Sequence, residues 1–127
     1  MAHQLKWLVD KRVLLIKYTG AIDKDTLLSM NADMNRILEE GIQPVHVIAD
    51  NTEMSDVRVN LKVIQQSFGT LRNPAWGQIT IVTGENKMVA FFSQLIGTSF
   101  RIKLRVVNTM EDAKRIINQA DNTVNLT

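Results

Sequence analysis

The sequence predicts an α/β fold: a mostly parallel five-stranded sheet with helices mainly on one face. Strand-like and helix-like segments follow the order β-β-α-β-α-β-α-β-α over 127 residues, which implies parallel strands joined by right-handed crossovers. The first two strands are separated only by residues 10–11, which implies an antiparallel hairpin. The later strands are apolar on one side and mixed on the other, unlike strands that are covered on both faces.

The first half begins with hairpin strands expected over Gln4–Val9 and Arg12–Thr19, with Gly20 as their stop. Asp23 is expected to cap a helix, because its carboxylate can accept from a free amide of the first turn. Gly41 is expected to end that helix in the left-handed conformation, which costs glycine no Cβ clash. The apolar face of the helix consists of Leu27, Met30, Met34, Ile37 and Leu38.

The centre of the chain is a buried strand over Val45–Ala49, opened by Pro44. A polar loop is expected after it, over Asn51–Arg58. Asn60 then precedes a helix whose apolar positions run to Leu71 and which ends before a proline, Pro74.

The last third predicts a strand over Gln78–Thr83, a helix over Lys87–Ile96 closed by Gly97, and a strand over Phe100–Val107. Thr109 begins the final helix as part of a capping box. Residues 1–120 are expected to form one domain, and the polar residues 121–127 a frayed tail.

Composition excludes several classes of protein. The chain is 45% hydrophobic and 22% charged, which is typical of globular domains. It has no cysteine, so it has no disulfide framework and no thiolate nucleophile. No segment reaches the length of a transmembrane helix, and a cytoplasmic protein is expected. The net charge of +2 is too small to indicate nucleic-acid binding.

The sequence predicts no catalytic residue, no metal site and no cofactor. Asp50 ends the central strand at the sheet edge where ligands bind in open α/β sheets. Ser55 follows it, but a serine nucleophile needs a base within hydrogen-bond reach. His46 lies at the start of the same strand, too far from Ser55, and we interpret it as a sheet-face side chain. Asp50 is therefore expected to organise the loop rather than to perform chemistry.

Two further surfaces are candidates for binding. The first is an apolar pocket or patch on the 87–96 helix, formed by Met88, Phe91, Phe92 and Leu95. The second is a basic row at period two, formed by Arg101, Lys103 and Arg105. The alternatives are a buried core helix and a solvated edge strand. No aromatic residue interleaves the basic row, which argues against single-stranded nucleic acid.

Three stretches carry a resemblance to a known family: Tyr18–Asp23, Val47–Asp50, and spaced residues between Phe91 and Ala113. With the order of elements, they make nearly the whole chain similar to the STAS superfamily, also called SpoIIAA-like. Within it, the chain looks like a branch of small single-domain bacterial proteins. The resemblance implies helices stacked on a sheet and a non-enzymatic role in binding a regulatory protein.

The resemblance also implies a phosphorylated serine or threonine after an aspartate, but here Ser55 precedes Asp56, so that site is not transferred. We predict a regulatory protein-interaction domain whose loop residues Asp50, Asn51, Ser55, Asp56, Arg58 and Asn60 meet a partner. The alternative is a carrier or sensor of an apolar small molecule or lipid that contacts membrane surfaces. A homodimer is compatible with either function.

Overall fold

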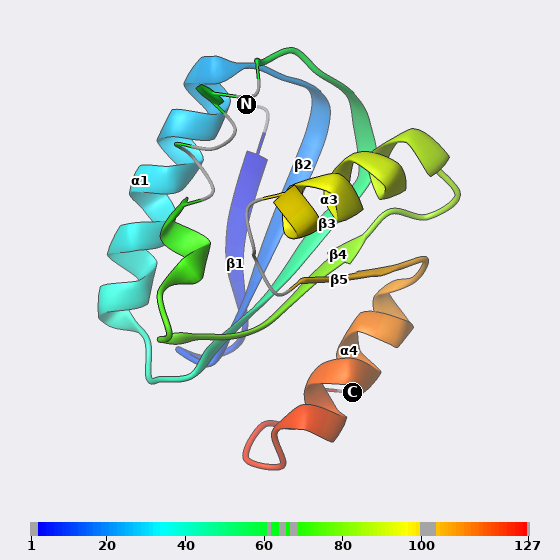
Figure 1. Cartoon of the computed structure of the whole chain (residues 1–127). Coiled ribbons are helices and arrows are strands. Elements are labelled where there is room, and N and C mark those ends of the chain that lie inside the picture. The colour runs from blue at the N-terminus through cyan, green and yellow to red at the C-terminus, as the bar shows by residue number, and fades with distance from the viewer. Residues whose placement is uncertain (1–2, 61, 64–65, 67–68, 100–103, 127) are drawn as a thin grey trace.

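The computed structural model describes residues 3–60, 62–63, 66, 69–99 and 104–126. Five strands form one sheet in the order β1-β2-β3-β4-β5 (Figure 1). β1 pairs antiparallel with β2, and every other neighbouring pair is parallel. The predicted mostly parallel sheet with an opening hairpin is confirmed. The strands are β1 (His3–Val9), β2 (Val13–Ile22), β3 (Val45–Val57), β4 (Trp76–Val82) and β5 (Leu104–Val107).

The helices are α1 (Lys24–Glu40), α3 (Lys87–Ser99) and α4 (Met110–Ala120), with a short 3₁₀ turn, η1 (Gly69–Arg72). The α3 helix continues through Gly97, so the prediction that this glycine ends the helix is wrong. Residues 62, 63 and 66 are helical, and the remainder of the helix predicted before η1 lies outside the described residues. Residues 100–103 of the predicted last strand also lie outside them.

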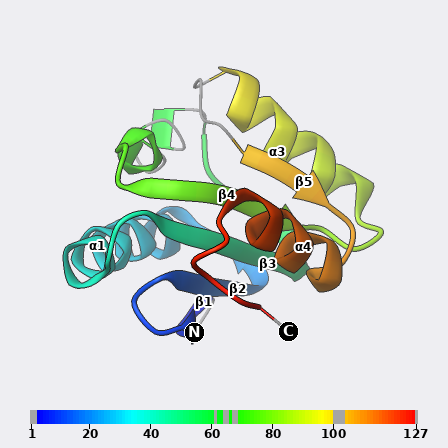
Figure 2. The same ribbon diagram turned by 90° about the horizontal axis from the view of Figure 1, so that it is seen from below.

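Helices cover both faces of the sheet, but unequally. Side chains of α1 and α3 share the larger core with Ile16, Val47 and Ile79 of the sheet. α4 packs on the opposite face, where Ile117 meets Ile48. Seen from below, α4 lies in front of β3 and β4 (Figure 2). The helices therefore lie mainly on one face, as predicted, with α4 as the cover of the other.

Both predicted helix caps are confirmed. The Asp23 carboxylate accepts from the backbone N–H of Thr26 at 2.9 Å. The Thr109 hydroxyl accepts from the backbone N–H of Asp112 at 3.1 Å. Each bond satisfies one of the amides that the first helical turn leaves unpaired.

The two glycines that flank α1 have roles other than those predicted. Gly20 does not stop the hairpin: it lies inside β2 with a φ of 74°, where the register with β3 shifts. Such a bulge uses glycine because it adopts positive φ at no steric cost. Gly41 is extended, with a φ of −80°. Glycine is needed at this position because a larger residue has no space: an added Cβ would lie 2.6 Å from Cγ2 of Val45.

The C-terminal tail is packed rather than frayed. Val124 and Leu126 are buried against the core that α4 makes with the sheet. The amide group of Asn118 holds the tail backbone, donating to the Leu126 carbonyl at 2.8 Å and accepting from its N–H at 2.9 Å. Alternating apolar residues in a short polar segment gave too weak a pattern to predict this packing.

Candidate functional site

β3 is much longer than the strand that the sequence predicts. It spans 13 residues, and the segment expected to be a loop is its second half. β2 pairs with β3 along its length, but the register changes in the middle. Lys17 faces Asp50 and Thr19 faces Glu53, so two residues of β3 lie opposite one residue of β2 between these pairs. A second shift follows between Gly20 and Ala21. These bulges break the strict alternation by which a strand is recognised, which explains why the prediction of a loop is wrong.

The bulged half of β3 sends its side chains in two directions. Asn51 and Met54 are buried, whereas Ser55 and Asp56 are exposed. Asp50 organises the chain locally, as expected: its carboxylate accepts from the backbone N–H of Thr52 at 3.0 Å and from the Thr52 hydroxyl at 2.7 Å. Asn51 therefore belongs to the interior and not to the surface on which the sequence placed it.

The other two residues of the predicted loop lie just beyond β3. Arg58 is exposed, and its Nε lies 3.1 Å from Oδ2 of Asp56. The Asn60 side chain accepts from the backbone N–H of Val63 at 3.0 Å, which is a capping role. Ser55 and His46 lie towards opposite ends of β3, about 30 Å apart at roughly 3.3 Å per residue. They are too distant to form a nucleophile–base pair.

The two other candidate surfaces are described only in part. The backbone of Met88, Phe91, Phe92 and Leu95 is helical, but their side chains lie outside the described part of the chain. Arg101 and Lys103 lie outside the described residues altogether. Arg105 is exposed on β5, as the basic row requires. The apolar patch and the basic face both stay predictions.

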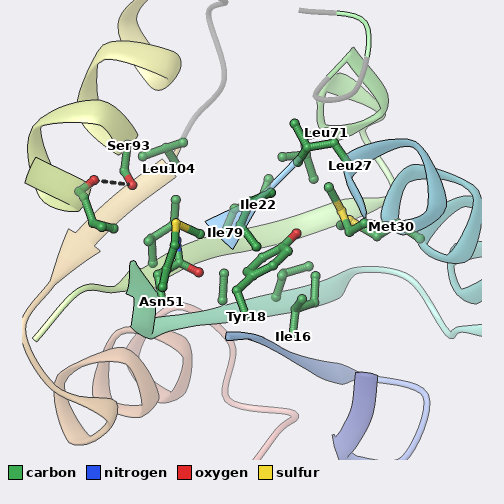
Figure 3. A pocket seen from close by; sticks show the side chains of 16 residues that line it. Ile16, Tyr18, Ile22, Leu27, Met30, Asn51, Leu71, Ile79, Ser93 and Leu104 are labelled. Atoms are coloured by element: carbon green, nitrogen blue, oxygen red, sulfur yellow. Dashed lines mark hydrogen bonds between the residues drawn. The ribbon is translucent and has the colours of Figure 1, made fainter. Parts of the chain in front are cut away.

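An apolar cavity of about 70 Å³ lies between the sheet and helices α1 and α3 (Figure 3). Its described lining comes from β2, β3, β4 and β5, from both helices and from η1. Among the described lining residues, none has a charged side chain. They are Ile16, Tyr18, Ile22, Leu27, Met30, Met34, Val47, Ala49, Asn51, Met54, Leu71, Ile79, Ile81, Val89, Ser93 and Leu104.

Three polar side chains lie among these apolar ones: Asn51 from β3, Tyr18 from β2 and Ser93 from α3 (Figure 3). The Ser93 hydroxyl donates to the Val89 carbonyl at 2.8 Å. Burial raises the pKa of the Tyr18 hydroxyl above its ordinary value, because its ionised form would lose hydration. The Asn51 Oδ1 is buried without a hydrogen-bond partner among the described residues. The sequence analysis does not indicate this site, because it predicts a loop from Asn51 onwards, whereas Asn51 continues the strand on the same face as Val47 and Ala49.

A polar cluster lies at the other end of β3. The Nδ1 of His46 accepts from the Gln78 backbone N–H at 2.8 Å, and its Nε2 lies 2.9 Å from Oδ2 of Asp121. Arg12 donates to the same Asp121 oxygen at 2.8 Å and to the Thr123 hydroxyl at 3.0 Å. The cluster joins the hairpin turn, the sheet and the end of α4. His46 is thus more than the sheet-face side chain that we expected, but its partners lie too far away in sequence to be predicted.

The shape of the molecule is similar to that of solved SpoIIAA structures. The anti-sigma factor antagonist SpoIIAA in its unphosphorylated form superposes with a TM-score of 0.64 at 14% identity, covering 94% of this chain and 100% of that one. The phosphorylated form of the Bacillus cell fate determinant SpoIIAA gives 0.59 at 14%, covering 91% and 99%. An uncharacterised protein with a SpoIIAA-like fold from Shewanella loihica PV-4 gives 0.66 at 12%, covering 94% and 93%.

At these identities the likeness concerns the fold, and the SpoIIAA-like fold inferred from the sequence is confirmed. Neither a family model nor a curated protein matches the sequence. Within the described residues, no helix is both long enough and apolar enough to cross a membrane.

Proposed function

We propose that this chain is a non-enzymatic regulatory domain that binds another protein through the exposed end of β3. We call the surface formed by Ser55, Asp56 and Arg58 the β3-end surface. The observation that carries the proposal is that Ser55 and Asp56 are exposed on a strand fixed by pairing with β2 up to Val57. Arg58 follows this strand directly, and its backbone N–H donates to the Ile22 carbonyl at 2.7 Å. Support comes from the shared fold, because SpoIIAA is described as an anti-sigma factor antagonist. Exposed side chains positioned by a rigid scaffold are well suited to recognition.

The charges of this surface are available to a partner. The side chains of Arg58 and Asp56 are 70% and 49% exposed, and their ion pair spans 3.1 Å. An exposed pair of this kind contributes only about 0–1 kcal/mol to stability. A partner whose charged groups replace the Arg58–Asp56 ion pair therefore gives up little binding free energy. Exposed charges of this kind mainly increase the rate of association.

The test compares partner capture by two double variants. Asp56→Ala with Arg58→Ala removes the charges of the β3-end surface. Glu39→Ala with Glu40→Ala removes exposed charges at the end of α1 and is the control. We expect a binding partner, identified by mass spectrometry after cross-linking in cells, to be lost from the first variant and kept by the second, with both melting temperatures unchanged. If every captured protein binds both variants alike, the β3-end surface is not the interface.

A second candidate function is the binding of an apolar small molecule, and the cavity under α1 and α3 favours it. Its volume of about 70 Å³ is roughly half that of an engineered cavity, about 150 Å³, that holds benzene. The cavity is therefore too small for a lipid chain in this conformation. Of the apolar ligands that the sequence analysis considers, only small molecules remain candidates. Titration with toluene, followed by the methyl NMR signals of Ile79 and Val89, tests it. We expect saturable shifts, and unmoved signals would exclude an accessible cavity.

A further inference from the structure

The side chain of Asn51 has no evident structural reason to be where it is. The residue is only 6% exposed, and its Oδ1 is buried without a partner among the described residues. It lines the cavity under α1 and α3 together with mostly apolar side chains (Figure 3). A buried acceptor that has given up water and gained no hydrogen bond destabilises the folded state, and such groups are rare in native proteins.

A leucine would fill the same place without this penalty. Asn51 faces the cavity on the same side of β3 as Val47 and Ala49, and the bulge that follows it brings Met54 to this side as well. Bulges are common beside functional sites, where they re-aim side chains. A single water is a poor partner here, since a buried water normally makes about three hydrogen bonds and this lining is almost entirely apolar. An unpaired acceptor in an apolar cavity is suited to a ligand that brings its own donor.

We infer that Asn51 is the polar recognition residue of a small-molecule site, accepting a hydrogen bond from an uncharged apolar ligand with one O–H or N–H group. The inference rests on the second candidate function. We expect a neutral ligand because no side chain in the described lining is charged, and burying an unpaired charge is very unfavourable. Alcohols, phenols and primary amides have this chemistry.

The lining is suited to repacking around ligands larger than the empty cavity. Met30, Met34 and Met54 all contribute to it. Methionine is unbranched and has three rotatable bonds, so it repacks around ligands of different shape more readily than branched side chains do. A six-membered ring is therefore a reasonable probe, although the empty cavity is smaller than one that holds benzene.

The experiment compares phenol with toluene, which differ by O–H against CH₃ and have nearly the same shape. Dissociation constants come from NMR titrations of the whole chain. We expect phenol to bind at least about fivefold more tightly than toluene, after correction for their different transfer from water. A factor of five corresponds to about 1 kcal/mol, the usual net contribution of one hydrogen bond.

Two variants separate the role of Asn51 from a general effect on packing. Asn51→Leu removes the acceptor and keeps the approximate shape. We expect it to abolish the preference for phenol, to keep toluene binding and to raise the melting temperature. Thr80→Val is the control, because Oγ1 of Thr80 is also buried and unpartnered but does not line the cavity. We expect this variant to keep the preference for phenol.

The outcomes are distinguishable. If toluene binds but phenol is not preferred, or if Asn51→Leu keeps the preference, the inference is wrong while the cavity remains a ligand site. If neither probe binds the wild type, both the inference and the second candidate function fail. A fall in melting temperature for Asn51→Leu would show that the side chain has a structural role instead. None of these results depends on the β3-end surface.

Discussion

Nε2 of His46 lies 2.9 Å from Oδ2 of Asp121, across 75 positions of sequence. Because Nδ1 of the same ring accepts from the Gln78 backbone N–H, the proton is on Nε2, which donates to the carboxylate. The His46 side chain is only 3% exposed, so this donor has no ready access to water. The contact ties the end of α4 to the amino ends of β3 and β4.

Replacement of Asp121 by alanine is expected to destabilise the protein by about 1–3 kcal/mol. The change leaves the buried Nε2–H of His46 without an acceptor, and an unsatisfied buried donor costs about that much. Urea denaturation with a fixed m-value measures the effect. The control is Asp112→Asn, which removes a partly exposed ion pair with Arg115 and one acidic charge from the first turn of α4, and is expected to cost about 1 kcal/mol or less. Equal effects of the two changes would argue against the cluster as a stabilising contact.

Acid should weaken the same contact. The Thr123 hydroxyl, the His46 ring and the Thr123 backbone N–H all donate to the Asp121 carboxylate, and with Arg12 nearby they hold its pKa well below the usual value. The unfolded chain therefore binds this proton first as the pH falls. The stabilisation is complete above about pH 5 and declines below about pH 4, the ordinary range of an aspartate. We expect the stability difference between wild type and Asp121→Ala to shrink between about pH 5 and pH 2, whereas a constant difference would contradict the assignment.

Gly77 lies too close to a neighbouring ring to tolerate a methyl group. A Cβ there would collide with the ring of His46. We expect Gly77→Ala to destabilise by about 1–3 kcal/mol, as overpacking usually does. A clash with the His46 ring disappears when that ring is removed, whereas an effect of alanine on the backbone of β4 would remain. A double-mutant cycle with His46→Ala should therefore show a smaller cost of Gly77→Ala, and additive costs would place the strain elsewhere.

The tail offers a simple test of its packing. Leu126 is buried against the core of α4, so Leu126→Ala should cost about 2 kcal/mol or more. The neighbouring Asn125 is exposed, and Asn125→Ala should stay within about 0.5 kcal/mol. Thermal or urea denaturation compares the two variants. If Leu126→Ala were as neutral as its control, the tail would not be part of the folded core.

Much of the fold follows from local patterns. The apolar stripe of α1, the caps Asp23 and Thr109, and the alternation within the first half of β3 are set by residues close in sequence. Errors arose where tertiary contacts overrode such signals. A glycine often marks the end of a strand, but Gly20 lies at a bulge, where its positive φ is allowed, and β2 continues beyond it. The sequence correctly predicts that α1 ends at Gly41, but glycine is needed there because Val45 leaves no space for a Cβ, and the backbone is extended rather than left-handed.

The candidate site was harder to predict because it depends on these same irregularities. The sequence predicts Asn51 as part of an exposed interaction loop, whereas it lies inside β3 and its side chain is buried. The partners of His46 come from the hairpin turn and from beyond α4, and no spacing rule joins such distant positions. Ser55, Asp56 and Arg58 are exposed, as a binding surface requires, and their role stays a prediction.

The spatial order of the strands equals their order in the sequence. Each new strand therefore pairs with the one made just before it, and none has to insert between two strands already joined. Pairings between consecutive elements keep the sequence separation of contacts small, which favours rapid folding. If the strands assemble in sequence order, the partial sheet has β1 at one edge and a single growing edge at the other. Folding intermediates of this domain should therefore be truncated versions of the native sheet rather than rearranged ones.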